Sequence, residues 1–131
     1  MIYCEVYEQS TDADKVGAFL ENLLPFCGRY PEPRSVIFMD NASFHFFTPA
    51  VKKAIGDAGV ILEYQPPYSP DLNPIEYLFG SIKNRIRARS LVDGDLIQGD
   101  LKSYLSMQVR ITGNDRVARG HFKKAQIDIQ E

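Results

Sequence analysis

Apolar positions in the first forty residues follow two different spacings. Residues 1–8, "MIYCEVYE", partly alternate aromatic and β-branched residues with polar ones, which is typical of a strand. A helical spacing comes next, at Val16, Phe19, Leu20 and Leu23. Its cap can come from Ser10, Thr11 or Asp12. The continuous apolar run "SVIFMD", residues 35–40, then predicts a buried strand covered on both faces.

The alternation of helices and strands continues in the next segment. "TPAVKKAIGDAG", residues 48–59, predicts a helix that Thr48 caps and Gly59 ends, with Pro49 in its first turn. "VILEY", residues 60–64, is a second short apolar strand.

The rest of the chain predicts helices. After a proline-rich loop, five residues mark one face of a helix that runs to about Arg89: Ile75, Leu78, Phe79, Ile82 and Ile86. Residues 93–111 suggest a helix weakened by Gly94 and Gly99, and residues 114–124 suggest a last short one. This order of strands and helices predicts an α/β layer with parallel pairing.

Composition is that of an ordinary globular protein, with 44% hydrophobic and 24% charged residues in a length typical of one domain. Charge is uneven. Residues 1–66 hold five Lys and Arg against nine Asp and Glu, whereas residues 67–131 hold ten against eight. We therefore expect any site for a polyanion to lie in the second half.

Cys4 and Cys27 stand far apart among apolar residues, which favours buried, reduced thiols in an intracellular protein. The sequence shows no secretory signal and no apolar run of about 18 residues, so we expect no membrane partner.

Asp40 ends the predicted strand and opens the polar turn "DNASFH". Ligand sites in open α/β sheets gather at the carboxyl ends of strands, so an acid here is placed for chemistry. The alternative is that Asp40 caps the turn through its own side chain.

Glu76 follows the stretch "QPPYSPDLNP", residues 65–74, and its interpretation is also open. Asn73, Pro74 and Glu76 fit the N-cap, first and third positions of a helix, which approximates a capping box. The helix dipole also favours a carboxylate in the first turn, and one of its oxygens can still face a metal ion. A further alternative is that the prolines bind a partner domain as polyproline II.

Asp40 and Glu76 each follow the end of a predicted strand, and the two strands are neighbours in the chain. Carboxylates meeting at one sheet edge can hold Mg²⁺, and two such ions can stabilise the attacking and leaving oxygens of a phosphodiester. That chemistry normally needs a third carboxylate. His45 lies five residues after Asp40. It is either a metal ligand or a loop residue that makes hydrogen bonds.

Four cations lie on the helix that Glu76 opens: Lys83, Arg85, Arg87 and Arg89. Lys83 and Arg87 lie roughly on the Glu76 side, and the other two form a second row. The run is either a solvated face or a stripe that binds a phosphate backbone, and it also resembles a nuclear-import patch.

These motifs closely resemble the catalytic domain of mariner-like transposases, in the DDE superfamily of endonucleases with an RNase H-like fold. The resemblance is carried by "VIFMDNASFH", residues 36–45, and by "LEYQPPYSPDLNPIEYLFGSIKNRIR", residues 62–87. Between Asp40 and Glu76 lie 35 residues, close to the family's usual gap.

The resemblance implies that Asp40 and Glu76 are the second and third catalytic acids and ligate Mg²⁺ or Mn²⁺ while DNA strands are cleaved and transferred at transposon ends. It also implies that an active-site loop is shaped by Asn41, His45, Pro66, Pro67, Ser69, Pro70, Asp71, Asn73 and Pro74.

The expected fold is α/β, a partial RNase H-like fold with a short, mostly parallel sheet and flanking helices. In the family the first catalytic Asp lies on the first strand, whereas Met1 begins at what resembles the third. We therefore expect a truncated domain without the first two strands. Residues 1–92 would form the sheet and active-site region, and residues 93–131 the last helices. Open sheet edges predict marginal stability and self-association.

Two functions follow from this interpretation. The first is a DDE endonuclease domain, inactive on its own because one of three acids is missing, and nuclear in a eukaryote. The second is a non-catalytic relative that binds nucleic acid or dimerises. A decaying reading frame without a function is a third possibility.

Overall fold

The computed structural model describes residues 1–40 and 47–127 of the chain. They form two compact units that divide between Tyr68 and Ser69. We call residues 9–68 the sheet unit, and residues 69–127, together with residues 1 and 3–8, the helical unit. Each unit is described by itself.

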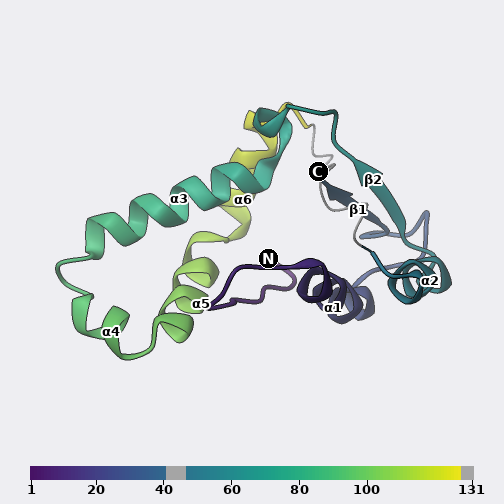
Figure 1. Ribbon diagram of the computed structural model, residues 1–131. Coiled ribbons are helices and arrows are strands. Elements are labelled where there is room, and N and C mark those ends of the chain that lie inside the picture. Colours follow the sequence, from purple (N-terminus) through teal and green to yellow (C-terminus); the bar gives the residue numbers. More distant parts are fainter. Residues whose placement is uncertain (41–46, 128–131) are drawn as a thin grey trace. The chain divides into compact units, whose positions relative to one another are not determined.

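The sheet unit holds two helices and two short parallel strands (Figure 1). Its elements are α1 (Ala13–Leu23), a 3₁₀ turn η1 (Leu24–Phe26), β1 (Val36–Met39), α2 (Pro49–Ala58) and β2 (Ile61–Tyr64). Helix α2 connects the strands, whose register pairs Val36 with Ile61 and Met39 with Tyr64. The predicted order of helix, strand, helix and strand is confirmed over these residues.

Both helices of the sheet unit begin where local sequence signals indicate, and α2 also ends at its predicted glycine. The carboxylate of Asp12 accepts a hydrogen bond from the N–H of Lys15, and the Thr48 hydroxyl accepts one from Val51. Gly59 follows α2 with φ of 70°, a left-handed conformation that favours glycine.

An apolar cluster holds the sheet unit together. Leu20 of α1 packs with Val51 and Ile55 of α2, and the Ile37 and Met39 side of β1 packs against them. Gly17 lets the helices approach, because a Cβ there would lie 3.1 Å from Cγ2 of Val51.

The opposite face of β1 is open, which corrects the prediction of a strand covered on both faces. Val36 and Phe38 alternate with the packed residues and are 47% and 51% exposed. Both helices of this unit pack on the other face of the strand, so the continuous apolar run in the sequence does not mean burial on both sides.

The predicted strand at residues 1–8 is wrong. No strand forms there, and the described sheet pairs β1 with β2 alone. The alternation still places side chains together, because the hydroxyls of Tyr3 and Tyr7 both donate to the carboxylate of Glu5. A strand requires a second strand that pairs with its backbone, and the described sheet contains only β1 and β2.

The helical unit consists of five elements: η3 (Pro70–Leu72), α3 (Pro74–Arg89), α4 (Gly94–Gly99), α5 (Leu101–Thr112) and α6 (Asp115–Lys124). Helix α3 packs against α5 and α6 (Figure 1). The single helix expected over residues 93–111 is two, because Asp100 interrupts it and caps α5 through the N–H of Ser103. Helix α6 begins after its cap Asn114, within the predicted range 114–124.

Both cysteines are free, as predicted. Cys27 is half-buried beside the apolar cluster of the sheet unit, whereas Cys4 is exposed, so the expected burial is wrong for Cys4. None of the helices in the described part of the chain has the length and apolar content to cross a bilayer.

We predict that Leu20→Ala destabilises the sheet unit by about 2–5 kcal/mol, because it removes a buried side chain at the centre of the cluster. Urea unfolding measures the change, with Glu21→Ala on the exposed side of the same helix as the control. Equal unfolding free energies for the two variants would contradict the assigned core.

Candidate active site

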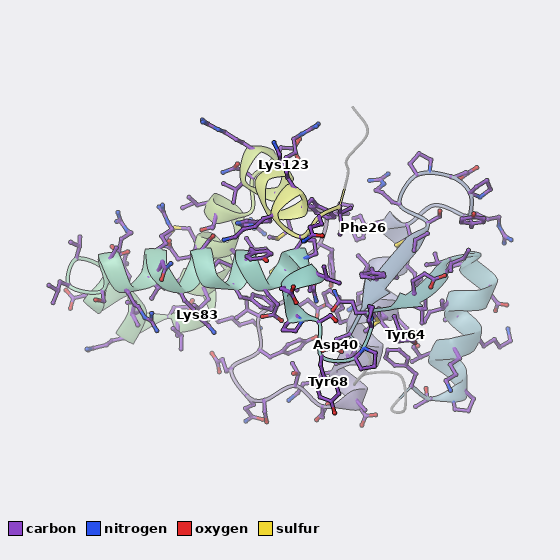
Figure 2. The ribbon with its side chains drawn as sticks, turned by 90° about the horizontal axis from the view of Figure 1, so that it is seen from above. Phe26, Asp40, Tyr64, Tyr68, Lys83 and Lys123 are labelled. Atoms are coloured by element: carbon purple, nitrogen blue, oxygen red, sulfur yellow. The ribbon has the colours of Figure 1, made fainter. Side chains whose placement is uncertain are left out.

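Asp40 directly follows β1, at the carboxyl end of the parallel pair. It is exposed, and it lies beside Tyr64 at this end of the sheet unit (Figure 2). The position is the one expected for a ligand-binding acid in a parallel sheet. The turn that Asp40 opens, with Asn41 and His45, lies outside the described residues, so their predicted roles stay predictions.

Gln65 is a polar residue that sequence reasoning did not single out. It directly follows β2, its N–H donates to the carbonyl of Met39 at 2.8 Å, and its side chain is buried. Within the described residues, its Nε2 has no hydrogen-bond partner. A buried amide without an acceptor is costly, so this group offers a donor to an oxygen at the end of the sheet where Asp40 lies. The sequence signal that could have identified Gln65 is its position between the end of the apolar strand and the pair of prolines, Pro66 and Pro67.

The proline loop ends the sheet unit and begins the helical unit. Pro66, Pro67 and Tyr68 are exposed, and Tyr68 has φ of 57°, which is uncommon for a residue other than glycine. Ser69 begins the helical unit, and Pro70 and Asp71 lie in the turn η3 that follows it.

Asn73 caps α3 as predicted, and Pro74 occupies the first turn. The Asn73 amide oxygen accepts from the N–H of Ile75 at 3.3 Å. The N–H of Asn73 donates to the Pro70 carbonyl at 3.1 Å, so it is already used and does not require Glu76 as an acceptor. The reciprocal capping box with Glu76 is therefore not formed.

Glu76 lies in the first turn of α3 with an exposed side chain. In the part of the chain that the structure describes, its carboxylate makes no hydrogen bond or ion pair. Next to it in sequence, the Tyr77 hydroxyl donates to the Asp71 carbonyl at 2.9 Å, which fixes η3 to the start of the helix. The loop thus fixes the backbone on both sides of Glu76 and leaves its carboxylate available.

Lys83 and Arg87 share a face of α3 with Glu76, since helical spacing brings positions 76, 83 and 87 together. All three side chains are exposed, and Lys83 is marked on α3 in Figure 2. This row, which we call the Glu76 row, therefore combines one available carboxylate with two available cations.

The second row of cations is occupied within the helical unit. Arg85 donates from Nε to the buried amide of Gln108 at 2.7 Å. Arg89 donates to both carboxylate oxygens of Asp93, at 2.8 and 3.0 Å, and the Tyr104 hydroxyl donates to the same carboxylate at 2.9 Å. These contacts bind α3 to the segment leading into α4 and to α5.

The Arg89 guanidinium, followed by the Tyr104 hydroxyl, holds the pKa of Asp93 below its ordinary value. Burial and the Asp93 carboxylate raise the pKa of Tyr104. Asp93 is 4% exposed, so it needs these donors to remain charged.

Asp40 and Glu76 belong to different units, and the structure describes each in its own surroundings. No group of three His, Cys, Asp or Glu side chains that could hold a metal ion occurs among residues 1–40 and 47–127. The metal-binding roles predicted for Asp40 and Glu76 therefore stay predictions; their hard oxygen donors are of the kind that Mg²⁺ or Mn²⁺ prefers.

Residues 2–97 match the model of a family described as DDE superfamily endonuclease. The matched residues include Asp40, Gln65 and Glu76, and they end in α4, so α5 and α6 lie beyond the match. No curated protein and no solved structure matches the chain.

We predict that the helical unit loses stability as the pH falls below about 4. The folded-state pKa of Asp93 is lowered from an ordinary value of about 3.9, so its contribution is present above that pH and is lost as protonation proceeds. Asp93→Asn should lower the unfolding free energy at pH 7 and reduce its pH dependence, as measured by urea unfolding at several pH values.

Asp95→Asn is the matched control, because Asp95 is an exposed acid two residues away. If Asp93→Asn and the wild type lose stability in parallel as the pH falls, the assigned role of the Asp93 carboxylate is wrong.

Proposed function

Since the chain belongs to the DDE superfamily endonuclease family, we propose that it is the catalytic domain of a mariner-like transposase that acts on DNA. The observation that carries the proposal is the position of two acids within the family match. Asp40 ends the first of two parallel strands, and Glu76 opens the helix after the second.

Asp40 and Glu76 would hold a divalent metal ion between them. Both carboxylates are exposed, and each lies where the backbone is fixed by a strand end or a capped helix start. When bound, such ions stabilise the attacking and leaving oxygens of a phosphodiester. The family uses three acids, and these two are the ones that we assign.

The proline loop has a positioning role in this proposal. Pro67, Ser69, Pro70, Asp71 and Pro74 would fix the path of the chain into α3, so that Glu76 meets the metal in one orientation. Carboxylate ligands must be held to within a fraction of an ångström, which a proline-rich path with few conformations favours.

DNA would contact the Glu76 row. Lys83 and Arg87 are exposed cations on the face that carries the catalytic acid, so they are placed to bind phosphates beside the reacting bond. Arg85 and Arg89 would support this surface indirectly, because their hydrogen bonds to Gln108 and Asp93 fix the orientation of α3.

Binding of nucleic acid without cleavage is the second candidate function. Lys83 and Arg87 supply phosphate contacts whether or not a metal ion is bound, and two acids alone fall short of the family's set.

We predict that Mn²⁺ strengthens DNA binding by this chain without nicking supercoiled DNA. A metal ion shared by Asp40 and Glu76 would neutralise two carboxylates beside the phosphates, whereas hydrolysis would require the further acid. Binding is measured by fluorescence anisotropy of a labelled duplex with Mn²⁺ or EDTA, and nicking is measured on a plasmid in the same buffers.

Asp40→Asn and Glu76→Gln should each abolish the effect of Mn²⁺ and retain binding in EDTA. Glu21→Gln is the control, because it removes an exposed carboxylate of α1 that has no assigned role in the site. An unchanged Mn²⁺ effect in both variants would contradict the proposed site. Mn²⁺-dependent nicking by the wild type that both variants lose would contradict the expected inactivity.

A further inference from the structure

Helix α6 carries a row of three exposed cations that the family match does not include. Arg116, Arg119 and Lys123 are spaced three and four residues apart, which places them on one face over a length of about 10 Å. We call them the α6 row. All three side chains are exposed.

The opposite face of α6 is used for packing against α3. Nε2 of His121 lies 3.2 Å from the Ser81 hydroxyl, and Ala125, directly after the helix, is buried. Lys124 lies over the ring of Tyr77, 4.7 Å from its centroid. These contacts fix the rotation of α6, and Figure 2 shows Lys123 on the side turned away from α3.

Charge on α6 is concentrated and not neutralised. Residues 115–124 hold four Lys and Arg against one Asp, a net charge of +3, whereas the chain has a net charge of −2. Among the described residues, no ion pair or hydrogen bond involves the side chains of the α6 row. Arg116 also lies in the first turn, where the helix dipole disfavours a cation, so helix stability does not account for it.

We propose that the α6 row is a second contact for the phosphate backbone of nucleic acid, separate from the Glu76 row. Arginine binds phosphate through two parallel hydrogen bonds, and contacts of this kind are independent of base sequence. The choice of nucleic acid as the polyanion rests on the proposed function. The position of the row rests on α6 alone.

A membrane surface fits this helix less well. Helices that lie in a bilayer interface insert an apolar face below their basic one. The inner face of α6 is already engaged with α3 through His121 and Lys124, so it is not available for insertion.

The test is the salt dependence of DNA binding by the full chain in EDTA, which removes any contribution of a metal site. Each phosphate contact adds about 0.9 to the slope of log affinity against log salt concentration. The triple variant Arg116→Gln, Arg119→Gln and Lys123→Gln should therefore reduce the slope by about 2.7. Glutamine is a good helix former, and circular dichroism checks that the fold is retained.

Two controls separate position from net charge. Arg116→Lys with Arg119→Lys keeps the charge and should keep the slope. Lys124→Gln removes a charge from the same helix on its packed side, so its slope should change by less than about 0.9.

Lys83→Gln with Arg87→Gln distinguishes the two proposals. A slope that falls in this variant and stays unchanged in the α6 triple variant overturns the α6 row and leaves the proposed function standing. A slope that falls in the α6 triple variant alone supports the α6 row and overturns the DNA contact of the Glu76 row. A wild type that binds anionic lipid vesicles but not DNA, with vesicle binding lost in the α6 triple variant, overturns nucleic acid as the ligand.

Discussion

A buried carboxylate, Asp93, determines how the helical unit packs. A charge that is 4% exposed needs donors, and Arg89 and Tyr104 supply three hydrogen bonds from two helices. Arg85 makes a similar contact with buried Gln108. These contacts fix α3 to α5, and this arrangement directs the Glu76 row away from the packed side. The cations that sequence analysis grouped together thus have two different roles.

Local structure was readable from the sequence because its signals act over a few residues. Asp12, Thr48, Asn73 and Asn114 each accept a hydrogen bond from the first turn of the helix they precede, and each lies before an apolar repeat. The place of Glu76 in the first turn was predicted in the same way, from the cap at Asn73, whereas its candidate role as a site acid came from the family resemblance. The capping box expected between Asn73 and Glu76 is absent, because the N–H of Asn73 donates to the Pro70 carbonyl and not to the Glu76 carboxylate.

Features that depend on distant residues were not readable. Residues 1–8 have the composition of a strand, yet pairing requires a neighbour, and sequence pattern alone does not show whether one is present. The same limit applies to the open face of β1 and to Gln65, whose importance comes from lying after β2 opposite the end of β1. The different roles of the two rows of cations on α3 were not readable either. Arg85 contacts Gln108, which is distant in sequence, and Arg89 contacts Asp93 only because the chain turns after α3.

Paramagnetic broadening of backbone amide signals by Mn²⁺ measures whether Asp40 and Glu76 bind one metal ion, as we propose. Binding of one ion by both acids should broaden the signals around residues 39–40 and around residues 75–78 at the same low Mn²⁺ concentration. Either Asp40→Asn or Glu76→Gln should remove the broadening from both segments. Broadening that is confined to one segment, or that persists at one acid when the other is replaced, would contradict a shared site.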